Sequence, residues 1–227
     1  NFNTSNVTDM SYMFNGCSNL LNLDVSNFDT SRVTGMIAMF YNCSSLTNID
    51  VSNFDTSNVK SMEAMFGLCS NLNTLDLSNF DTSNVTNMGN QVGKGGMFQG
   101  CTNLKSLNIS SFNTLNVTNM TWLFASCKSL TEIDVSNFDT SKVTSMRGMF
   151  SDASSLQTLN ISNFNLSNVD SMSVMFKNCT NLINLILPNS SAPKLINIQY
   201  AFYKCTNLKG TIDLSNFKPN NYVDFEF

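Results

Sequence analysis

Histidine is absent from this 227-residue chain, charged residues make up only 12% of it, and there is a single tryptophan. The charged share is about half of what soluble domains usually carry. Nucleic acids and anionic lipids are bound by clustered Lys and Arg. The formal net charge of −4 therefore makes neither an expected partner. Without histidine, and with no carboxylate that stands out from a repeated position, the chain lacks candidate catalytic residues, and we expect no enzymatic activity.

Long apolar runs are also missing. No segment approaches the 18 apolar residues that a membrane-spanning helix needs. The first residues, Asn1 to Met10, match the middle of a repeat, so we expect this sequence to be a fragment of a longer protein. Any signal peptide, amino-terminal cap or wall anchor would then lie outside it.

A 26-residue repeat fills the chain. One phenylalanine marks the period, and its copies are 26 residues apart in every step except one that is longer by six: Phe14, Phe40, Phe66, Phe98, Phe124, Phe150, Phe176 and Phe202. Such a unit cannot bury its apolar side alone and must stack on its neighbours. We expect a single solenoid over 1–227, with a loop insertion at 89–96, a divergent repeat at about 182–208 and a C-terminal end or cap at 209–227.

Each repeat contains two patterns. Leu20 to Ser26 alternates apolar and polar residues, which predicts a strand with one buried face, and stacked copies predict a parallel sheet. Val33, Met36, Met39, Phe40 and Cys43 form one stripe of a short helix. A 3₁₀ or irregular segment is the alternative. Because packed helices need about 8–10 Å and strands about 4.8 Å, an outer helix would curve the stack and place the sheet on its concave side, whereas an irregular segment would leave it straighter.

The motifs L-x-x-L-x-V and M-F-x-x-C resemble a leucine-rich repeat. The fuller string L-D-V-S-N-F-D-T-S-x-V-T-x-M-x-x-M-F-x-x-C is similar to the BspA-like repeat of surface proteins in mycoplasmas and Gram-positive bacteria. The resemblance covers the whole chain, and Leu185 to Ser190 resembles a sister repeat type. It implies an α/β solenoid, a right-handed leucine-rich-repeat-like stack with one short parallel strand and one short helix or 3₁₀ segment per turn.

Sulfur-containing residues occupy fixed positions. The thirteen methionines fall in two columns, that is, at two fixed positions of the repeat. We expect their adaptable side chains to fill the core, and a row of thioethers that binds a metal or reacts with oxidants is the less favoured alternative. The cysteines form one column with Ala153 as its missing member. Buried thiols are favoured there, and disulfides between turns or a metal ladder are the alternatives. The column is Cys17, Cys43, Cys69, Cys101, Cys127, Cys179 and Cys205.

Polar columns raise the question of ligands. One column of side chains should point outward from the strands, and calcium bridging would relieve the repulsion between its carboxylates. The column contains Asp24, Asp50, Asp76 and Asp134, with Asn108 and Asn160 in the same column. We expect no other cofactor and no other metal. A second column that begins at Asp29 is better explained by turn and cap hydrogen bonds. A remote alternative takes a threonine column as an ice-binding array: Thr30, Thr56, Thr82, Thr114 and Thr140.

Two features depart from the regular repeat. The insertion at 89–96 contains G-x-x-x-G-K, but its spacing and context do not fit a phosphate-binding loop, and an exposed loop is expected. Trp122 should lie on the outer face, either as a binding anchor or in local packing.

The resemblance implies adhesion. We expect a non-enzymatic module, at the cell surface or secreted and monomeric, that presents an extended polar concave sheet to a protein or glycan of host or neighbouring bacterial cells. The alternative is a spacer that projects another domain. The candidate ligand-binding residues are Asn22, Asp24, Asn48, Asp50, Thr74, Asp76, Ser106, Asn108, Trp122, Glu132 and Asp134.

Overall fold

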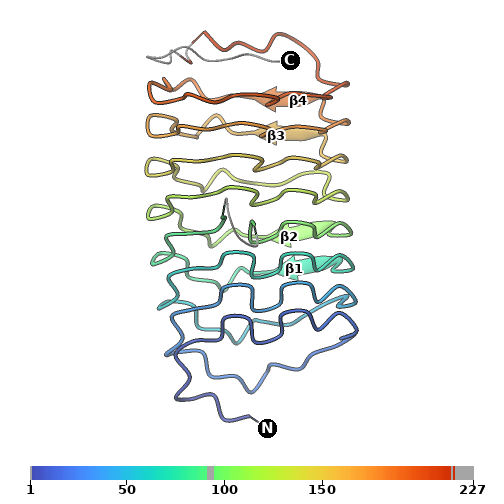
Figure 1. The fold of residues 1–227 in the computed structure, drawn as a ribbon, viewed down its shortest axis with the longest axis vertical. Helices are drawn as coiled ribbons and strands as arrows, with labels where there is room; N and C mark the ends of the chain where they lie inside the picture. Colours follow the sequence, from blue (N-terminus) through green and yellow to red (C-terminus); the bar gives the residue numbers. More distant parts are fainter. Residues whose placement is uncertain (1, 91–94, 216, 218–227) are drawn as a thin grey trace.

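The turns of the chain stack along one axis into a nearly straight column (Figure 1). The computed structural model describes residues 2–90, 95–215 and 217. The centre of the expected insertion and most of the expected C-terminal cap lie outside them. A column of parallel bridges joins each turn to the next and runs through Asp9, Gly35, Ser61, Asn87, Asn119, Ser145, Ser171 and Asn197.

Regular strands are shorter and fewer than the alternation predicts. β1 (Thr74–Asp76) pairs in parallel with β2 (Ser106–Asn108), and β3 (Thr158–Asn160) pairs in parallel with β4 (Asn184–Ile186). The predicted parallel strands are therefore confirmed at the centre of four repeats. The predicted lengths of about seven residues are wrong.

The predicted helix is wrong: the residues described by the structure contain none. The segment is a run of β-turns, in which Met39 N donates to Met36 O and Tyr41 N donates to Ala38 O. Ala38 and Asn42 have φ of 51° and 59°, in the left-handed region. Left-handed residues cannot continue a right-handed helix.

Backbone bonds between turns explain why the helix is lost. The amides of Ala38, Phe40 and Asn42 donate to carbonyls of the next turn at 2.8, 2.9 and 2.7 Å. These amides are therefore unavailable for bonds within a helix. The segment keeps the close spacing of a sheet, so the stack stays straight and its expected concavity does not develop.

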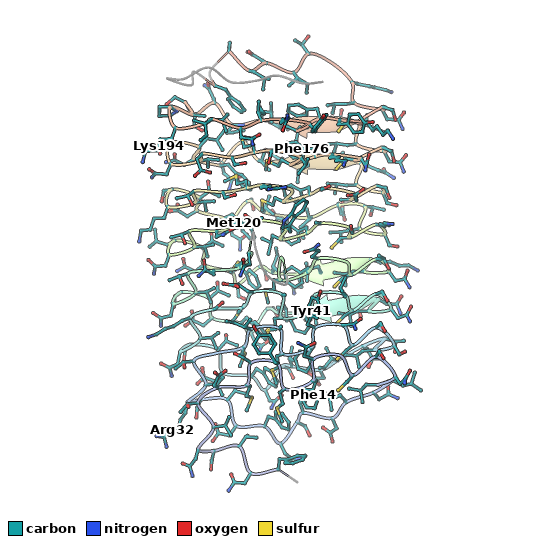
Figure 2. All side chains as sticks on the ribbon, in the orientation of Figure 1. Phe14, Arg32, Tyr41, Met120, Phe176 and Lys194 are labelled. Atoms are coloured by element: carbon teal, nitrogen blue, oxygen red, sulfur yellow. The ribbon has the colours of Figure 1, made fainter. Side chains whose placement is uncertain are left out.

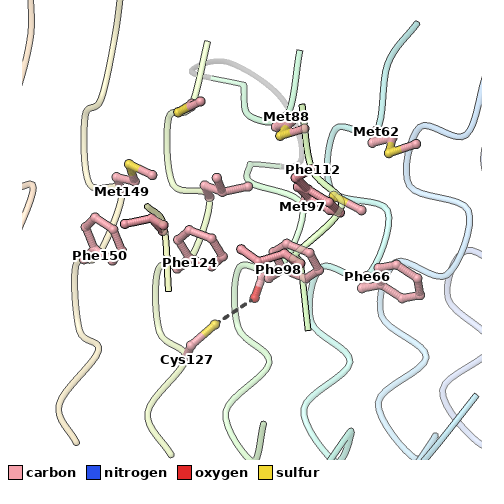
Figure 3. Close-up of a cluster of buried hydrophobic side chains, with 14 of the residues drawn as sticks. Met62, Phe66, Met88, Met97, Phe98, Phe112, Phe124, Cys127, Met149 and Phe150 are labelled. Atoms are coloured by element: carbon pink, nitrogen blue, oxygen red, sulfur yellow. Dashed lines mark hydrogen bonds between the residues drawn. The ribbon is translucent and has the colours of Figure 1, made fainter. Parts of the chain in front are cut away.

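The core is built from the repeated apolar columns. The eight marker phenylalanines stack with ring centroids 5.5–6.2 Å apart, and Figure 3 shows Phe66, Phe98, Phe124 and Phe150 in one row. Twelve of the thirteen methionines are buried, and Met13 is the exposed one. The prediction that methionine fills the core is confirmed.

The cysteines are free thiols, of which five are buried, Cys205 is half-buried and Cys17 is exposed. From Cys43 onward each thiol donates to the carbonyl of the marker phenylalanine in the preceding turn; Cys127 Sγ lies 3.3 Å from Phe98 O (Figure 3). Burial raises the pKa of Cys127 to about 12. The column therefore bonds one turn to the next, a role that the sequence pattern did not indicate.

The threonine column is buried, which contradicts the ice-binding alternative. Thr30 Oγ1 donates to Asp55 O at 2.9 Å and accepts from Asp55 N at 2.8 Å, so one hydroxyl joins two turns. Thr30, Thr56, Thr82, Thr114 and Thr140 are each at most 1% exposed. An asparagine column acts similarly: Asn163 Nδ2 donates to Val135 O and Phe138 O.

The insertion leaves the stack at one point and returns to it. Met97 N donates to Met88 O at 2.9 Å and closes the neck of the loop. A side chain at Gly89 or Gly96 would overlap the backbone of Thr121 or Trp122 in the next turn. Both positions therefore require glycine.

Candidate functional site

The exposed side chains of the strand column form one surface, which we call the strand face. Ten of the candidate residues lie exposed on it: Asn22, Asp24, Asn48, Asp50, Thr74, Asp76, Ser106, Asn108, Glu132 and Asp134. Figure 2 shows Arg32 and Lys194 projecting from the opposite edge of the stack, away from the four strands. The strand face and the edge that carries Arg32 and Lys194 are therefore separate surfaces.

The aspartates of the strand face are held by local bonds. Ser26 N donates to Asp24 Oδ1 at 2.9 Å, and Ser136 N donates to Asp134 Oδ1 at 2.9 Å. Hydrogen bonds from the Ser26 side chain and amide lower the pKa of Asp24, and those from the Ser136 amide and side chain lower the pKa of Asp134. These carboxylates stay ionised at neutral pH.

Calcium was expected to be a candidate ligand of this column. In the described parts of the chain, no three His, Cys, Asp or Glu side chains are grouped closely enough to hold a metal ion. A repeat contributes at most one carboxylate to the column, and Asn108 and Asn160 stand in it as amides. The aspartates already accept the amide two residues further on. The column fits a structural turn motif, in which an Asp or Asn side chain accepts a nearby amide.

The strand face has more than one hollow, and one of them, called the hollow below, brings candidate residues together. The hollow has a volume of about 500 Å³. Half-buried Leu107 and Ile133 lie at its floor. The polar residues around it are Lys105, Ser106, Glu132, Asp134, Thr158 and Asn160. Of the candidate residues, Ser106, Glu132 and Asp134 are brought together there, and the others are not.

The hollow lies beside a segment that forms no strand. β2 and β3 flank residues 130–134, which form no strand. Gln157 N, in the turn that contains β3, donates a hydrogen bond to Thr131 O at 3.0 Å. Among the described residues, no backbone hydrogen bond joins residues 132–134 to β2. The inward side chains at the hollow, Leu107 of β2 and Ile133, are both half-buried, whereas Leu75 and Leu159 are buried.

Trp122 lies away from the hollow, in the run of β-turns. Its ring packs on Gly148 of the next turn, where an added Cβ would overlap it, and the Arg147 guanidinium lies 5.5 Å from the ring centroid. The indole is half-buried, with φ of 60°. These contacts match the local-packing alternative. A binding role for Trp122 stays a prediction.

Sequence reasoning missed three polar residues of the hollow, Lys105, Thr158 and Asn160. The sequence does contain an indication that Lys105 is unusual. Its column, Leu21, Thr47, Asn73, Lys105, Thr131, Gln157, Ile183 and Lys209, contains only two charged residues.

The repeat has a known family. A family model described as a Mycoplasma protein of unknown function, DUF285, matches residues 1–95 and 93–217. The chain belongs to the DUF285 family. This agrees with its resemblance to BspA-like surface-protein repeats. No curated protein matches this DUF285 chain.

Solved structures similar to this DUF285 chain include three bacterial proteins. A leucine-rich repeat protein from Bacteroides ovatus is 18% identical, with a TM-score of 0.45, over 85% of this chain and 43% of its own. The T. pallidum leucine-rich repeat protein is 17% identical, with a TM-score of 0.38, over 89% and 72%. A leucine-rich cell surface protein from Faecalibacterium prausnitzii is 16% identical, with a TM-score of 0.32, over 88% and 74%. The chain thus spans less than half of the first.

The described residues of this DUF285 protein include no helix long and apolar enough to cross a membrane. The strand face is a polar wall, and the hollow at Glu132 and Asp134 has an apolar floor. It offers hydroxyls, amides and carboxylates for binding.

Proposed function

We propose that this DUF285 protein is a non-enzymatic binding module of a bacterial cell surface, displayed or secreted, that binds a protein or glycan of host or neighbouring cells through the strand face. The hollow at Glu132 and Asp134 is the observation that carries the proposal. It coincides with a departure from the repeat, because Glu132 stands where other turns have Asn, Ser or Thr. Stacked repeats commonly use such extended surfaces for recognition.

A matched pair of tryptophan variants tests the proposal. Thr158→Trp fills the hollow, whereas Thr74→Trp alters the same exposed column outside it. On an array of surface proteins and glycans, we expect ligands that bind the wild type to be retained by Thr74→Trp and lost by Thr158→Trp. Equal binding by both variants would place recognition elsewhere.

A spacer is the second candidate, and the regular bonding between turns favours it. Thiol, threonine and asparagine columns each join neighbouring turns, and the stack is nearly straight (Figure 1). A spacer predicts no ligand on the array and an elongated monomer by small-angle X-ray scattering. Reproducible ligands that are lost with Thr158→Trp would contradict it.

A further inference from the structure

The strand face carries a marked excess of negative charge. Its exposed charged residues are six acidic ones against two basic ones: Asp24, Asp50, Asp76, Glu132, Asp134 and Asp213, against Lys105 and Lys209. Surfaces that recognise one another carry complementary charge, which also speeds their encounter. A partner of this face should therefore present cationic groups.

The hollow gives such a group a place to bind. Glu132 and Asp134 are two residues apart in an extended segment, so their side chains project to the same side. In the next turns, Asn108 and Asn160 stand level with Asp134, and Ser106 and Thr158 stand level with Glu132. Two carboxylates are thus framed by neutral groups that add hydrogen bonds without competing charge.

The floor of the hollow narrows the choice of cation. Leu107 and Ile133 are aliphatic and half-buried, so they leave apolar surface beside the carboxylates. Arginine and lysine combine an apolar stem with a charged head and cover such surface well. The described strand segments contain no aromatic side chain on which a sugar ring could stack. A side chain of a protein fits this hollow better than an amino sugar.

We propose that the hollow binds an extended segment of a partner protein through an arginine or lysine side chain, whose stem lies on Leu107 and Ile133 and whose head lies between Glu132 and Asp134. This inference rests on the proposed function and names the chemistry of its ligand. Lys105 at the rim repels the bound cation, so it opposes the two acids.

The repeat itself supplies matched variants. Glu132→Thr and Asp134→Asn install residues that other turns carry in the same columns, so the fold should tolerate both. Asp50→Asn makes the same charge change outside the hollow, and Lys105→Thr removes the opposing charge. The probe is a fluorescein-labelled peptide of alternating arginine and serine, and its citrulline counterpart is the neutral control. Glucosamine tests an amine from a sugar as a competitor.

Fluorescence anisotropy at low salt should show binding of the arginine peptide and none of the citrulline peptide. Because exposed ion pairs contribute modestly, we expect Glu132→Thr and Asp134→Asn each to weaken binding by about two- to fivefold, and Lys105→Thr to tighten it by a similar factor. Asp50→Asn should change the affinity by less than the hollow variants do, and glucosamine should not compete.

Four results would overturn the inference. Equal weakening by Asp50→Asn would show diffuse attraction to an acidic surface, and competition by glucosamine would indicate an amine-bearing sugar. Absence of peptide binding, with array ligands still lost in Thr158→Trp, would refute the cationic segment but leave the proposed function standing. Absence of binding in the peptide experiment and on the array would refute both the inference and the proposed function.

Discussion

The buried hydroxyl of Thr82 should contribute measurably to stability. Thr82 is fully buried, its Oγ1 donates to Asn113 O at 2.8 Å, and Asn113 N donates to the same Oγ1 at 2.8 Å. Thr82→Val keeps the shape of the side chain but removes both bonds between the turns. A hydrogen bond contributes about 0.5–1.5 kcal/mol net, so we expect the free energy of unfolding to fall by about 2 kcal/mol.

Two further variants separate the hydroxyl from other effects. Thr86→Val removes an exposed hydroxyl that bonds Lys60 O at 3.2 Å, and it should cost no more than about 0.5 kcal/mol. Thr82→Ser keeps the hydroxyl and loses one buried methyl, at about 1 kcal/mol. Urea unfolding followed by circular dichroism and by Trp122 fluorescence measures all three. A Thr82→Val loss no larger than that of Thr86→Val would refute a stabilising role for the buried bonds.

Three other predictions concern protons and packing. Burial raises the pKa of Cys127 to about 12 and that of Cys43 to about 11, above the ordinary 9.0. The stability that these thiols contribute is therefore present below pH 9 and is lost as the pH rises towards those values. The urea midpoint should fall above pH 9, and it should fall less in Cys127→Ala. The lowered pKa of Asp24 and of the other aspartates in its column has the opposite effect. Their contribution to stability is present above pH 3.8, the ordinary pKa, and is lost as the pH falls below it. Urea midpoints that stay constant down to pH 2 would contradict this prediction. Gly148→Ala should displace the Trp122 ring and destabilise the fold by about 1–3 kcal/mol, and an unchanged emission maximum would argue against the observed packing.

The apolar columns could be predicted from the sequence because each position in a stack has the same neighbours in every turn. Phe40, Met36 and Cys43 are buried as their spacing indicated. The helix could not be predicted correctly, because a stripe at i, i+3 and i+7 is equally compatible with successive β-turns. Bonds to the next turn decide between the two, and no property of a single repeat reveals them.

The sequence contains one indication of the β-turns. Gly16, Asn42, Gly100 and Asn178 share one column and are residue types that tolerate left-handed backbone, which occurs in turns as well as at helix ends. Leu68 and Lys204 in that column adopt φ of 59° although neither residue favours it, because the stack imposes the conformation. The column of Ala38 carries little signal, because most of its members adopt positive φ although their residue types do not favour it: Tyr12, Ala38, Ala64, Trp122, Val174 and Tyr200.

The candidate site was predicted in part. Alternation within the strand segment placed Glu132 and Asp134 on the surface correctly. The hollow is lined by residues of three neighbouring turns, such as Lys105, Glu132 and Asn160. Its shape belongs to the stacked turns together, so the sequence of one repeat does not contain it.

The range of the hydrogen bonds between turns determines how the length of the molecule can evolve. In the described residues, side-chain hydrogen bonds that join turns connect positions 24 to 35 apart, which is one turn and no more. A duplication or deletion of 26 residues, starting at any phase, therefore leaves every new pair of neighbours with matching columns. Recombination between gene copies would lengthen or shorten the protein in steps of one turn, about 4.8 Å each, without an intermediate that fails to fold.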